Sequence, residues 1–342
     1  MDSVRTHIGV DVGMDSLDIC YPNGDKKHVK NNKSCRASLI KKALKIKAIV
    51  CFEATGPYEE ALAEECLAAG VRAVRLDAWR TRKYAESRGR IEKTDRIDCE
   101  MIRDYAASLP EDELRFVKPL TQERKRLRDS VSARRNLLKT RNLIANVLES
   151  PVIDREIAKT LKGLVEKIDK TVGELEKTAD EAIAADSRMA DLARRFQEVK
   201  GVGPVLTRTV LASCPDIGEF NDKSIAKMVG NAPIDCESCT IKKPSRVRRG
   251  RDDLKQAFFM AAVSASRTNH ILSKTYQGLI QRGKPRKVAL TAVARHLAVL
   301  LNLIAKYDNF KLASDPKDEE RAKAAAEAAK TKRPRGRPRK AS

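Results

Sequence analysis

The chain has 342 residues, with 69 Lys and Arg against 47 Asp and Glu, so its formal net charge is +22 at pH 7. Hydrophobic residues make up 42% of the chain, enough for folded cores, which excludes a wholly disordered protein. No apolar stretch of about 18 residues and no signal-peptide core are present, so we expect a cytoplasmic protein without a membrane partner. The eight cysteines do not form a disulfide framework pattern, and we expect free thiols. The charge favours a polyanion, most commonly nucleic acid; a merely basic surface is the alternative.

The first part of the chain alternates predicted strands with predicted helices. Apolar, β-branched runs predict strands at 5–12, 17–21, 47–53 and 71–76. Helices are predicted from Gly56-Pro57 to about Leu67 and over 94–107. This alternation predicts an α/β domain over residues 1–112.

The middle of the chain, residues 113–190, shows long helical periodicity. Apolar residues lie near coiled-coil spacing from Leu120 to Ala145, Pro151 interrupts, and a second run continues from Ile157 to Ala182. The pattern predicts two long helices, either an antiparallel pair or an oligomeric coiled coil. Residues 118–141 hold nine Lys or Arg and two acids, which fits a solvated helix face or a nucleic-acid contact equally well.

The remaining sequence divides into a mostly α-helical domain over 191–312 and a tail over 313–342. The tail ends in a basic run and cannot build a core, so we expect it to be disordered when free. Its Arg335-Gly336-Arg337-Pro338 segment resembles an AT-hook, a peptide that lies in the minor groove of A·T-rich DNA. A nonspecific basic tail is the alternative.

Four acidic residues are the first candidate site. Asp11 and Glu53 end predicted strands, and Asp95 and Asp98 lie three residues apart at the start of a predicted helix. Strand ends and a helix start can meet at one edge of an α/β sheet. Carboxylates held together there need a divalent cation such as Mg²⁺, and paired ions support phosphoryl transfer. Alternatively, the helix acids complement the macrodipole and Glu53 is solvated, but Asp11 in an apolar strand needs a partner.

Two further motifs carry weaker signals. Gly201-Val202-Gly203-Pro204 before an apolar helix looks like the turn of a helix-hairpin-helix, in which backbone N–H groups approach a DNA phosphate. A tight turn without a ligand is equally compatible. Ser238 is predicted to lie in a polar loop between helices, before six Lys or Arg over 242–251. A single loop serine is rarely a nucleophile, and the lone pair Cys236 and Cys239 lacks the further ligands of a zinc site.

Several segments together resemble one family, the insertion-sequence transposases of the IS110 type. They span about residues 5–307 and read IGVDVGMDSLDIC (8–20), FEATGPYEEAL (52–62), EKTDRIDCEMI (92–102), VKGVGPVLTRTVL (199–211), GNAPIDCESCT (230–240), RGRDDLKQAFFMAA (249–262) and KPRKVALTAVARHLAVLLNLI (284–304). The resemblance implies an RNase H/RuvC-like domain of the DEDD type followed by a transposase domain with a catalytic serine.

The resemblance also implies roles for residues of this chain. Asp11, Glu53, Asp95 and Asp98 would bind Mg²⁺ or Mn²⁺, and Ser238 would attack a DNA phosphate to give a covalent phosphoserine linkage. A bridge RNA would select donor and target DNA, and a dimer or tetramer would combine the site of one subunit with the serine of another. The protein would act at the nucleoid.

Three features depart from the family pattern: Cys239 follows the serine in place of Gly, Asp77-Ala78 stands where Asn-Pro is common, and the AT-hook-like tail is an addition. Cys239 bears on the loop conformation, because Gly adopts positive φ at less cost than Cys. Two alternatives to a recombinase stay open, a RuvC-like metal-dependent structure-selective nuclease and a non-catalytic nucleic-acid-binding protein. The candidate nucleic-acid contacts are Lys93, Arg96, Lys200, Gly201, Gly203, Lys242, Lys243, Arg246, Arg248, Arg249, Arg251, Arg335 and Arg337.

Overall fold

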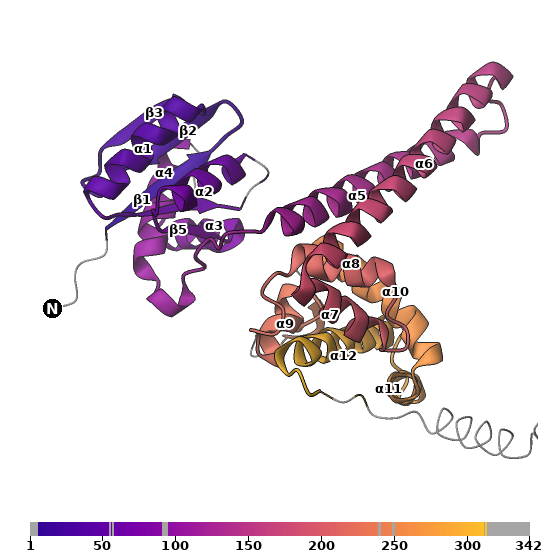
Figure 1. Ribbon diagram of the computed structural model, residues 1–342. Coiled ribbons are helices and arrows are strands. Elements are labelled where there is room, and N and C mark those ends of the chain that lie inside the picture. Colours follow the sequence, from indigo (N-terminus) through magenta and orange to yellow (C-terminus); the bar gives the residue numbers. More distant parts are fainter. Residues whose placement is uncertain are drawn as a thin grey trace, which may run out of the picture. The chain divides into compact units, whose positions relative to one another are not determined.

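The computed structural model describes residues 6–54, 56, 58–90, 95–238, 241–247, 250–310 and 312, without the side chains of 95–97 and 234–245. The chain forms two compact units, Met1–Leu120 and Thr121–Ser342 (Figure 1). Several sequence predictions fall outside the described residues: the tail at 313–342 and the candidate contacts Lys93, Arg248, Arg249, Arg335 and Arg337.

The first unit is built on a five-stranded mixed sheet with the order β3-β2-β1-β4-β5. The strands are β1 (His7–Val12), β2 (Ser16–Cys20), β3 (Lys26–Lys30), β4 (Ile49–Glu53) and β5 (Ala73–Leu76). β1, β4 and β5 are parallel, whereas β2 and β3 add antiparallel strands on the other side of β1. An antiparallel pair needs only a short turn, and β2 follows β1 after three residues.

Helices cover the two faces of this sheet. Helices α1 (Lys33–Lys45) and α2 (Glu59–Ala68) contribute residues such as Leu39 and Leu62 to a core with Val10 and Phe52. On the opposite face, Ile102 and Tyr105 of α4 (Asp95–Ser108) pack with Cys51 and Val74, and α3 (Ala78–Ser87) contacts α4. A short 3-10 helix, η1 (Glu111–Glu113), follows α4.

The predicted α/β character of this unit is confirmed, since the four predicted strands and both predicted helices are present. The structure adds β3, α1 and α3, which we did not predict. β3 is an exposed edge strand with the sequence KKHVK, so it has no buried apolar alternation to reveal it. Charges on an edge strand also discourage pairing with another chain.

The second unit begins with the two long helices that the periodicity predicts, α5 (Gln122–Leu148) and α6 (Arg155–Ala185). They lie side by side and run in opposite directions (Figure 1). Ion pairs connect them along their length: Arg126–Glu181, Arg134–Glu176 and Arg141–Asp169, with N···O distances of 3.1, 2.5 and 2.6 Å. These acids neutralise part of the positive charge of α5.

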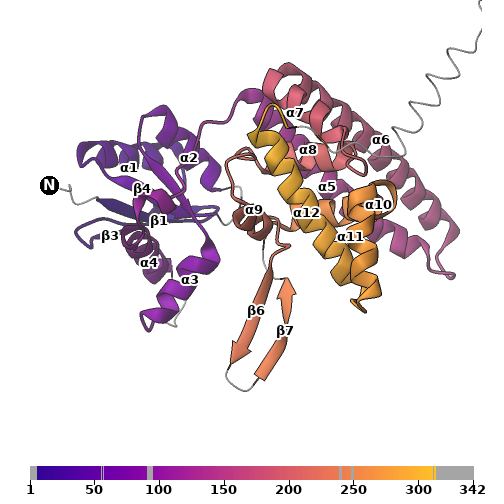
Figure 2. The ribbon, with the colours of Figure 1, turned by 90° about the horizontal axis from the view of Figure 1, so that it is seen from below.

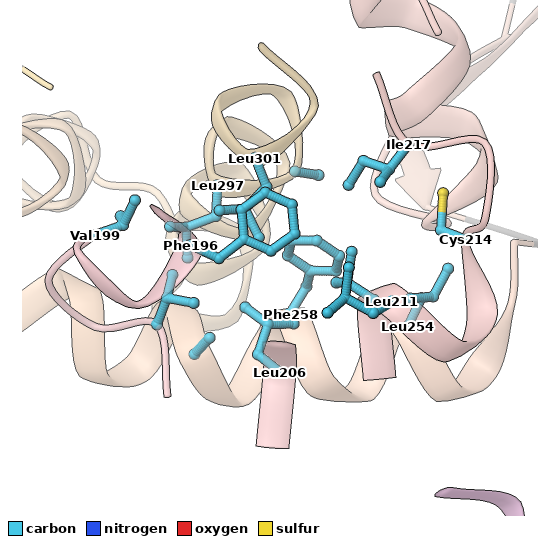
Figure 3. Packing of buried hydrophobic residues seen from close by; sticks show 14 of the residues in the cluster. Phe196, Val199, Leu206, Leu211, Cys214, Ile217, Leu254, Phe258, Leu297 and Leu301 are labelled. Carbon is cyan, nitrogen blue, oxygen red and sulfur yellow. The ribbon is translucent and has the colours of Figure 1, made fainter. Parts of the chain in front are cut away.

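The rest of the second unit is mostly helical, as expected. Its helices are α7 (Ser187–Gln197), α8 (Pro204–Ser213), α9 (Asp222–Met228), α10 (Asp252–Thr268), α11 (His270–Gln281) and α12 (Arg286–Lys306). Phe196, Phe258, Leu297 and Leu301 meet at the centre of their core (Figure 3). Among the described residues, α12 is the one helix long and apolar enough to cross a membrane, and its buried side belongs to this core.

Two strands that we did not predict interrupt these helices. β6 (Pro233–Ser238) and β7 (Ile241–Val247) form an antiparallel two-stranded sheet (Figure 2). Our prediction of a loop between helices at Ser238 is therefore wrong, because its backbone ends a strand and pairs with Ile241. The sequence IKKPSRV of β7 is polar and contains Pro, which hides a strand from pattern analysis.

Candidate active site and nucleic-acid interface

Strand register places Asp11 and Glu53 beside each other. In the parallel pair of β1 and β4, Val10 lies opposite Phe52, so the next residues along, Asp11 and Glu53, share one level. Val10 and Phe52 both belong to the core under α1 and α2. Because successive side chains alternate between faces, Asp11 and Glu53 lie on the face that α4 covers.

Helix α4 is held close to this face by a glycine. A Cβ atom on Gly9 would overlap with the carbonyl oxygen of Cys99 and with the backbone of Arg103, so the helix approaches β1 as no other residue would allow. Nη1 of Arg103 donates a hydrogen bond to the carbonyl oxygen of Tyr21, which lies toward the beginning of β1. The opposite end of α4, its N-terminus, therefore lies toward Asp11.

That N-terminus carries the other two predicted carboxylates. Asp95 begins α4, but its side chain lies outside the described part of the structure, and Asp98 follows within the first turn. Asp11, Glu53 and Asp98 are half-buried, and each interacts with at least one further group of the protein. Among the side chains that the structure describes, no group of three or more His, Cys, Asp or Glu is arranged to hold a metal ion.

A fifth acid, Asp18, lies in the same row. Asp18 of β2 is paired directly with Asp11 of β1, and on its other side with His28 of β3. Its carboxylate is buried, and Nδ1 of His28 lies 3.0 Å from both carboxylate oxygens. We did not single out Asp18, although the signal that marked Asp11, an acid between apolar strand residues, was present in the sequence LDIC.

Two thiols lie between the sheet and α4. Cys20 and Cys99 are both buried, and their mutual hydrogen bond lowers the pKa of Cys20 to about 7 while raising that of Cys99. Burial opposes the shift at Cys20, and the Arg103 guanidinium, with Nη1 3.1 Å from Sγ, adds to it. This contact helps to fix α4, which carries Asp98, against β2.

The predicted serine site lies in the second unit. Ser238 ends β6, and Lys242 and Lys243 follow on β7, opposite Glu237 and Cys236. The side chains of these residues are not described, so the structure gives no geometry for a nucleophile. Arg246 is exposed, whereas Nη1 of Arg251 donates to the carbonyl oxygen of Ser213 at 2.6 Å.

The glycine-containing turn lies between α7 and α8. Gly201 has a φ of 97°, and a Cβ atom there would overlap with Ala265 of α10. Backbone conformation and packing against α10 therefore explain why glycine occupies this position. Gly203 caps α8 and has open space around its Cα, while Pro204 begins the helix. The carbonyl oxygen of Lys200 accepts a weak hydrogen bond from Asn269 at 3.5 Å. The helix-hairpin-helix assignment stays a prediction.

The remaining predicted contact, Arg96, lies in the first turn of α4 without a described side chain. The structure thus brings Asp11 and Glu53 together on one sheet face, with the start of α4 directed toward them. It leaves the serine on a separate unit.

Comparison with known proteins finds family matches in two separate regions of the chain. Residues 193–277 match a family described as "Transposase IS116/IS110/IS902 family", and residues 8–155 match the transposase family of the IS110 DEDD type. A curated protein of Sinorhizobium fredii, named as a transposase candidate (y4pF/y4sB), is 23% identical over 254 residues. That match covers 65% of this chain and 65% of the relative's length.

Proposed function

Because the chain belongs to the IS110 family of transposases, we propose that it moves an insertion sequence by cutting and rejoining donor and target DNA. The observation that carries this proposal is the presence of both family regions, in order, on one chain. A strongly basic chain with a net charge of +22 fits a DNA substrate. The activity would take place in the cytoplasm, at the nucleoid.

Ser238 is our candidate nucleophile. Its Oγ would attack the phosphorus of a scissile phosphodiester, forming a phosphoserine bond while the bond to the leaving deoxyribose oxygen breaks and that oxygen takes up a proton. Attack by a hydroxyl of the other DNA partner would reverse the step, releasing the serine and joining the new strand. A serine needs a base or a cation-rich setting to react, and Lys242, Lys243 and Arg246 lie near it in sequence.

Asp11, Glu53, Asp95 and Asp98 are our candidates for holding Mg²⁺ or Mn²⁺. The donor set fits such an ion, because hard divalent cations prefer carboxylate oxygens, and the register of β1 and β4 supports the pairing of Asp11 with Glu53. A bound ion would supply positive charge at the reacting phosphate. The chain's own part is to hold Asp11 and Glu53 on the sheet and Asp95 and Asp98 at the start of α4, which covers that face.

Other parts of the molecule have proposed binding roles. We assign nucleic-acid contacts to the turn at Lys200–Gly203, read as a helix-hairpin-helix, to the basic residues of 242–251, to Lys93 and Arg96, and to the AT-hook-like tail. In accordance with the family resemblance, a bridge RNA would select the donor and target sequences by base pairing.

We also propose that the chain acts as a dimer or tetramer, with the α5–α6 pair as a coiled-coil contact between subunits. Apolar side chains near the connection between α5 and α6 support the idea. Leu143, Val147 and Ile157 are 67%, 52% and 56% exposed. Clustered apolar surface of this kind is typical of protein contacts. Regions 113–190 and 191–312 would then form separate functional domains.

A covalent-trapping assay tests the central proposal. The full chain is mixed with Mg²⁺, labelled donor and target DNA and the RNA that flanks its element, and products are separated on a denaturing gel. We expect a protein–DNA adduct from the wild type and none from Ser238→Ala or Asp11→Ala.

Ser264→Ala serves as the matched control, because Ser264 is an exposed serine of α10 that belongs to neither the carboxylate site nor the Ser238 site. Metal-dependent cleavage that survives Ser238→Ala would overturn the serine mechanism and favour a RuvC-like nuclease. Binding without any covalent or cleaved product would favour a non-catalytic protein.

A further inference from the structure

The outer strand of the first unit's sheet presents basic side chains beside the carboxylate row. β3 pairs with β2 so that His28 lies opposite Asp18 and Lys30 lies opposite Ser16. Asp18 shares its face with Asp11, and therefore so do His28, Lys30 and, two residues earlier, Lys26. Residues at this spacing are about 6.8 Å apart along the strand.

The other face of β3 provides an internal check on this assignment. Val29 packs against the core under α1 and α2, and Lys27, which shares its face, is exposed. Lys27 and Lys30 are therefore two exposed lysines on one strand that differ mainly in the face they occupy.

His28 is held in a defined orientation. Its Nδ1 is bound by the buried Asp18 carboxylate at 3.0 Å, while the imidazole side chain is 62% exposed. The carboxylate fixes the proton on Nδ1 and turns the Nε2 edge of the ring toward solvent. An exposed ring fixed by a buried acid is preorganised for a ligand in a way that a mobile surface histidine is not.

The position of Asp18 is costly for a purely structural residue. A carboxylate directly opposite Asp11 in an antiparallel pair adds like-charge repulsion, and a buried carboxylate also loses hydration. His28 offsets part of this cost from one side. An apolar residue at position 18 could fill this place in the sheet without the free-energy cost of a buried charge. The Asp18–His28 pair is therefore better explained by a role at the carboxylate row.

We propose that the Lys30 and His28 face of β3 binds the phosphate backbone of the DNA strand that enters the Asp11–Glu53 site. Two cationic or hydrogen-bonding groups at this interval can each contact a separate phosphate, and the row leads across β2 to Asp11. Lys26 is already paired with Glu100 of α4 at 2.5 Å, so it contributes less. This inference rests on the proposed DNA substrate.

Charge reversal on the two faces tests the proposal. Binding of a labelled duplex that carries the element's end is measured by fluorescence anisotropy for the full chain without divalent metal. We expect Lys30→Glu and His28→Ala each to weaken binding about tenfold. Lys27→Glu, which changes the net charge by the same amount as Lys30→Glu, should bind like the wild type. Thermal unfolding confirms that each variant is folded.

Equal losses from Lys27→Glu and Lys30→Glu would overturn the proposal, because net charge alone would then explain the effect. A loss confined to binding of the flanking RNA would also overturn it. The serine assay above reports the covalent adduct, whereas this assay reports non-covalent binding without divalent metal, so failure of one proposal is distinguishable from failure of the other.

A double-mutant cycle tests the role of Asp18 as a positioning residue. If Asp18 acts through His28, Asp18→Asn and His28→Ala each reduce binding, and the double variant loses no more than His28→Ala alone. Additive losses would show that Asp18 does not act through His28.

Discussion

Single residues decide how the first unit brings its acids together. Gly9 has no side chain, and that lets α4 approach β1 at the level just before Asp11. The sequence predicted the β1 strand and the α4 helix, but it did not predict their contact. The need for glycine at position 9 is apparent only when the structure shows that α4 packs directly against it. Asp18 was missed for a similar reason, since its pairing with Asp11 depends on register.

Glu59 illustrates a residue whose environment opposes its charge. It begins α2 and is 4% exposed, and its Oε2 has no hydrogen-bond partner among the described residues. Burial raises the pKa of its carboxyl above the ordinary value. A carboxyl with a raised folded-state pKa costs no stability while it is protonated, and it costs stability as pH rises through the unfolded and then the folded pKa.

We expect Glu59→Gln to increase the free energy of unfolding at pH 7, and this gain should shrink as pH falls toward about 4.3, the ordinary pKa of Glu. Urea unfolding at several pH values measures the difference between the variant and the wild type. Glu64→Gln on the exposed side of α2 controls for the change in net charge. A difference that does not depend on pH would contradict the explanation.

At the level of elements, long periodic helices were predictable and short polar strands were not. The α5–α6 pair shows sustained apolar spacing in the sequence. By contrast, β3, β6 and β7 have few apolar residues in their sequences, and each pairs with a strand next to it along the chain. Ser238 lies on such a strand, so its local structure could not be predicted from a helical pattern.

Arg208 joins two of the predicted helices. From α8 its Nε and Nη2 donate to the two carboxylate oxygens of Asp180 on α6, at 2.7 and 2.6 Å, and Nη1 lies 3.5 Å from Glu176. The hydrogen bonds to Asp180 raise the pKa of this guanidinium, which is largely buried. The two-point contact requires the planar guanidinium and cannot be copied by an amine.

We expect Arg208→Lys to lower the free energy of unfolding by about 1 kcal/mol and Arg208→Met by about 2 kcal/mol, measured by urea denaturation. Arg126→Lys is the matched control, because the Arg126–Glu181 pair is more than half exposed and should change stability by less than about 0.5 kcal/mol. Arg208→Lys with wild-type stability would show that the two-point geometry does not matter.

Across the whole molecule, charge is the property that the sequence predicts best. The excess of 22 positive charges is counted from the sequence alone, and it fits the two transposase families that the chain matches, because transposases act on DNA. The sequence could not say which basic groups are already paired. Three arginines of α5 face acids of α6, and Arg251 binds a backbone carbonyl, so these groups contribute less to an external partner.

The basic tail allows a test at this scale. Because each neutralised phosphate changes the logarithmic salt slope of DNA binding by about 0.9, a chain ending after residue 331 should show a shallower slope than the full chain. If the tail is an AT-hook, Arg335→Ala with Arg337→Ala should reduce binding to A·T-rich duplex more than to G·C-rich duplex. An equal reduction on both would indicate a nonspecific tail, and an unchanged slope would contradict a DNA contact by the tail.

The order of elements along the chain has a consequence for synthesis on the ribosome. The first unit is complete by Leu120, and α4, which carries the proposed ligands Asp95 and Asp98, follows all five strands of the sheet along the chain. Ser238 emerges more than a hundred residues later. Since domains generally fold as units during translation, the carboxylate half would mature first in every nascent chain. If Ser238 is the nucleophile, strand joining becomes possible only after the carboxylate half has folded, and a nascent chain that stops before Ser238 cannot join DNA.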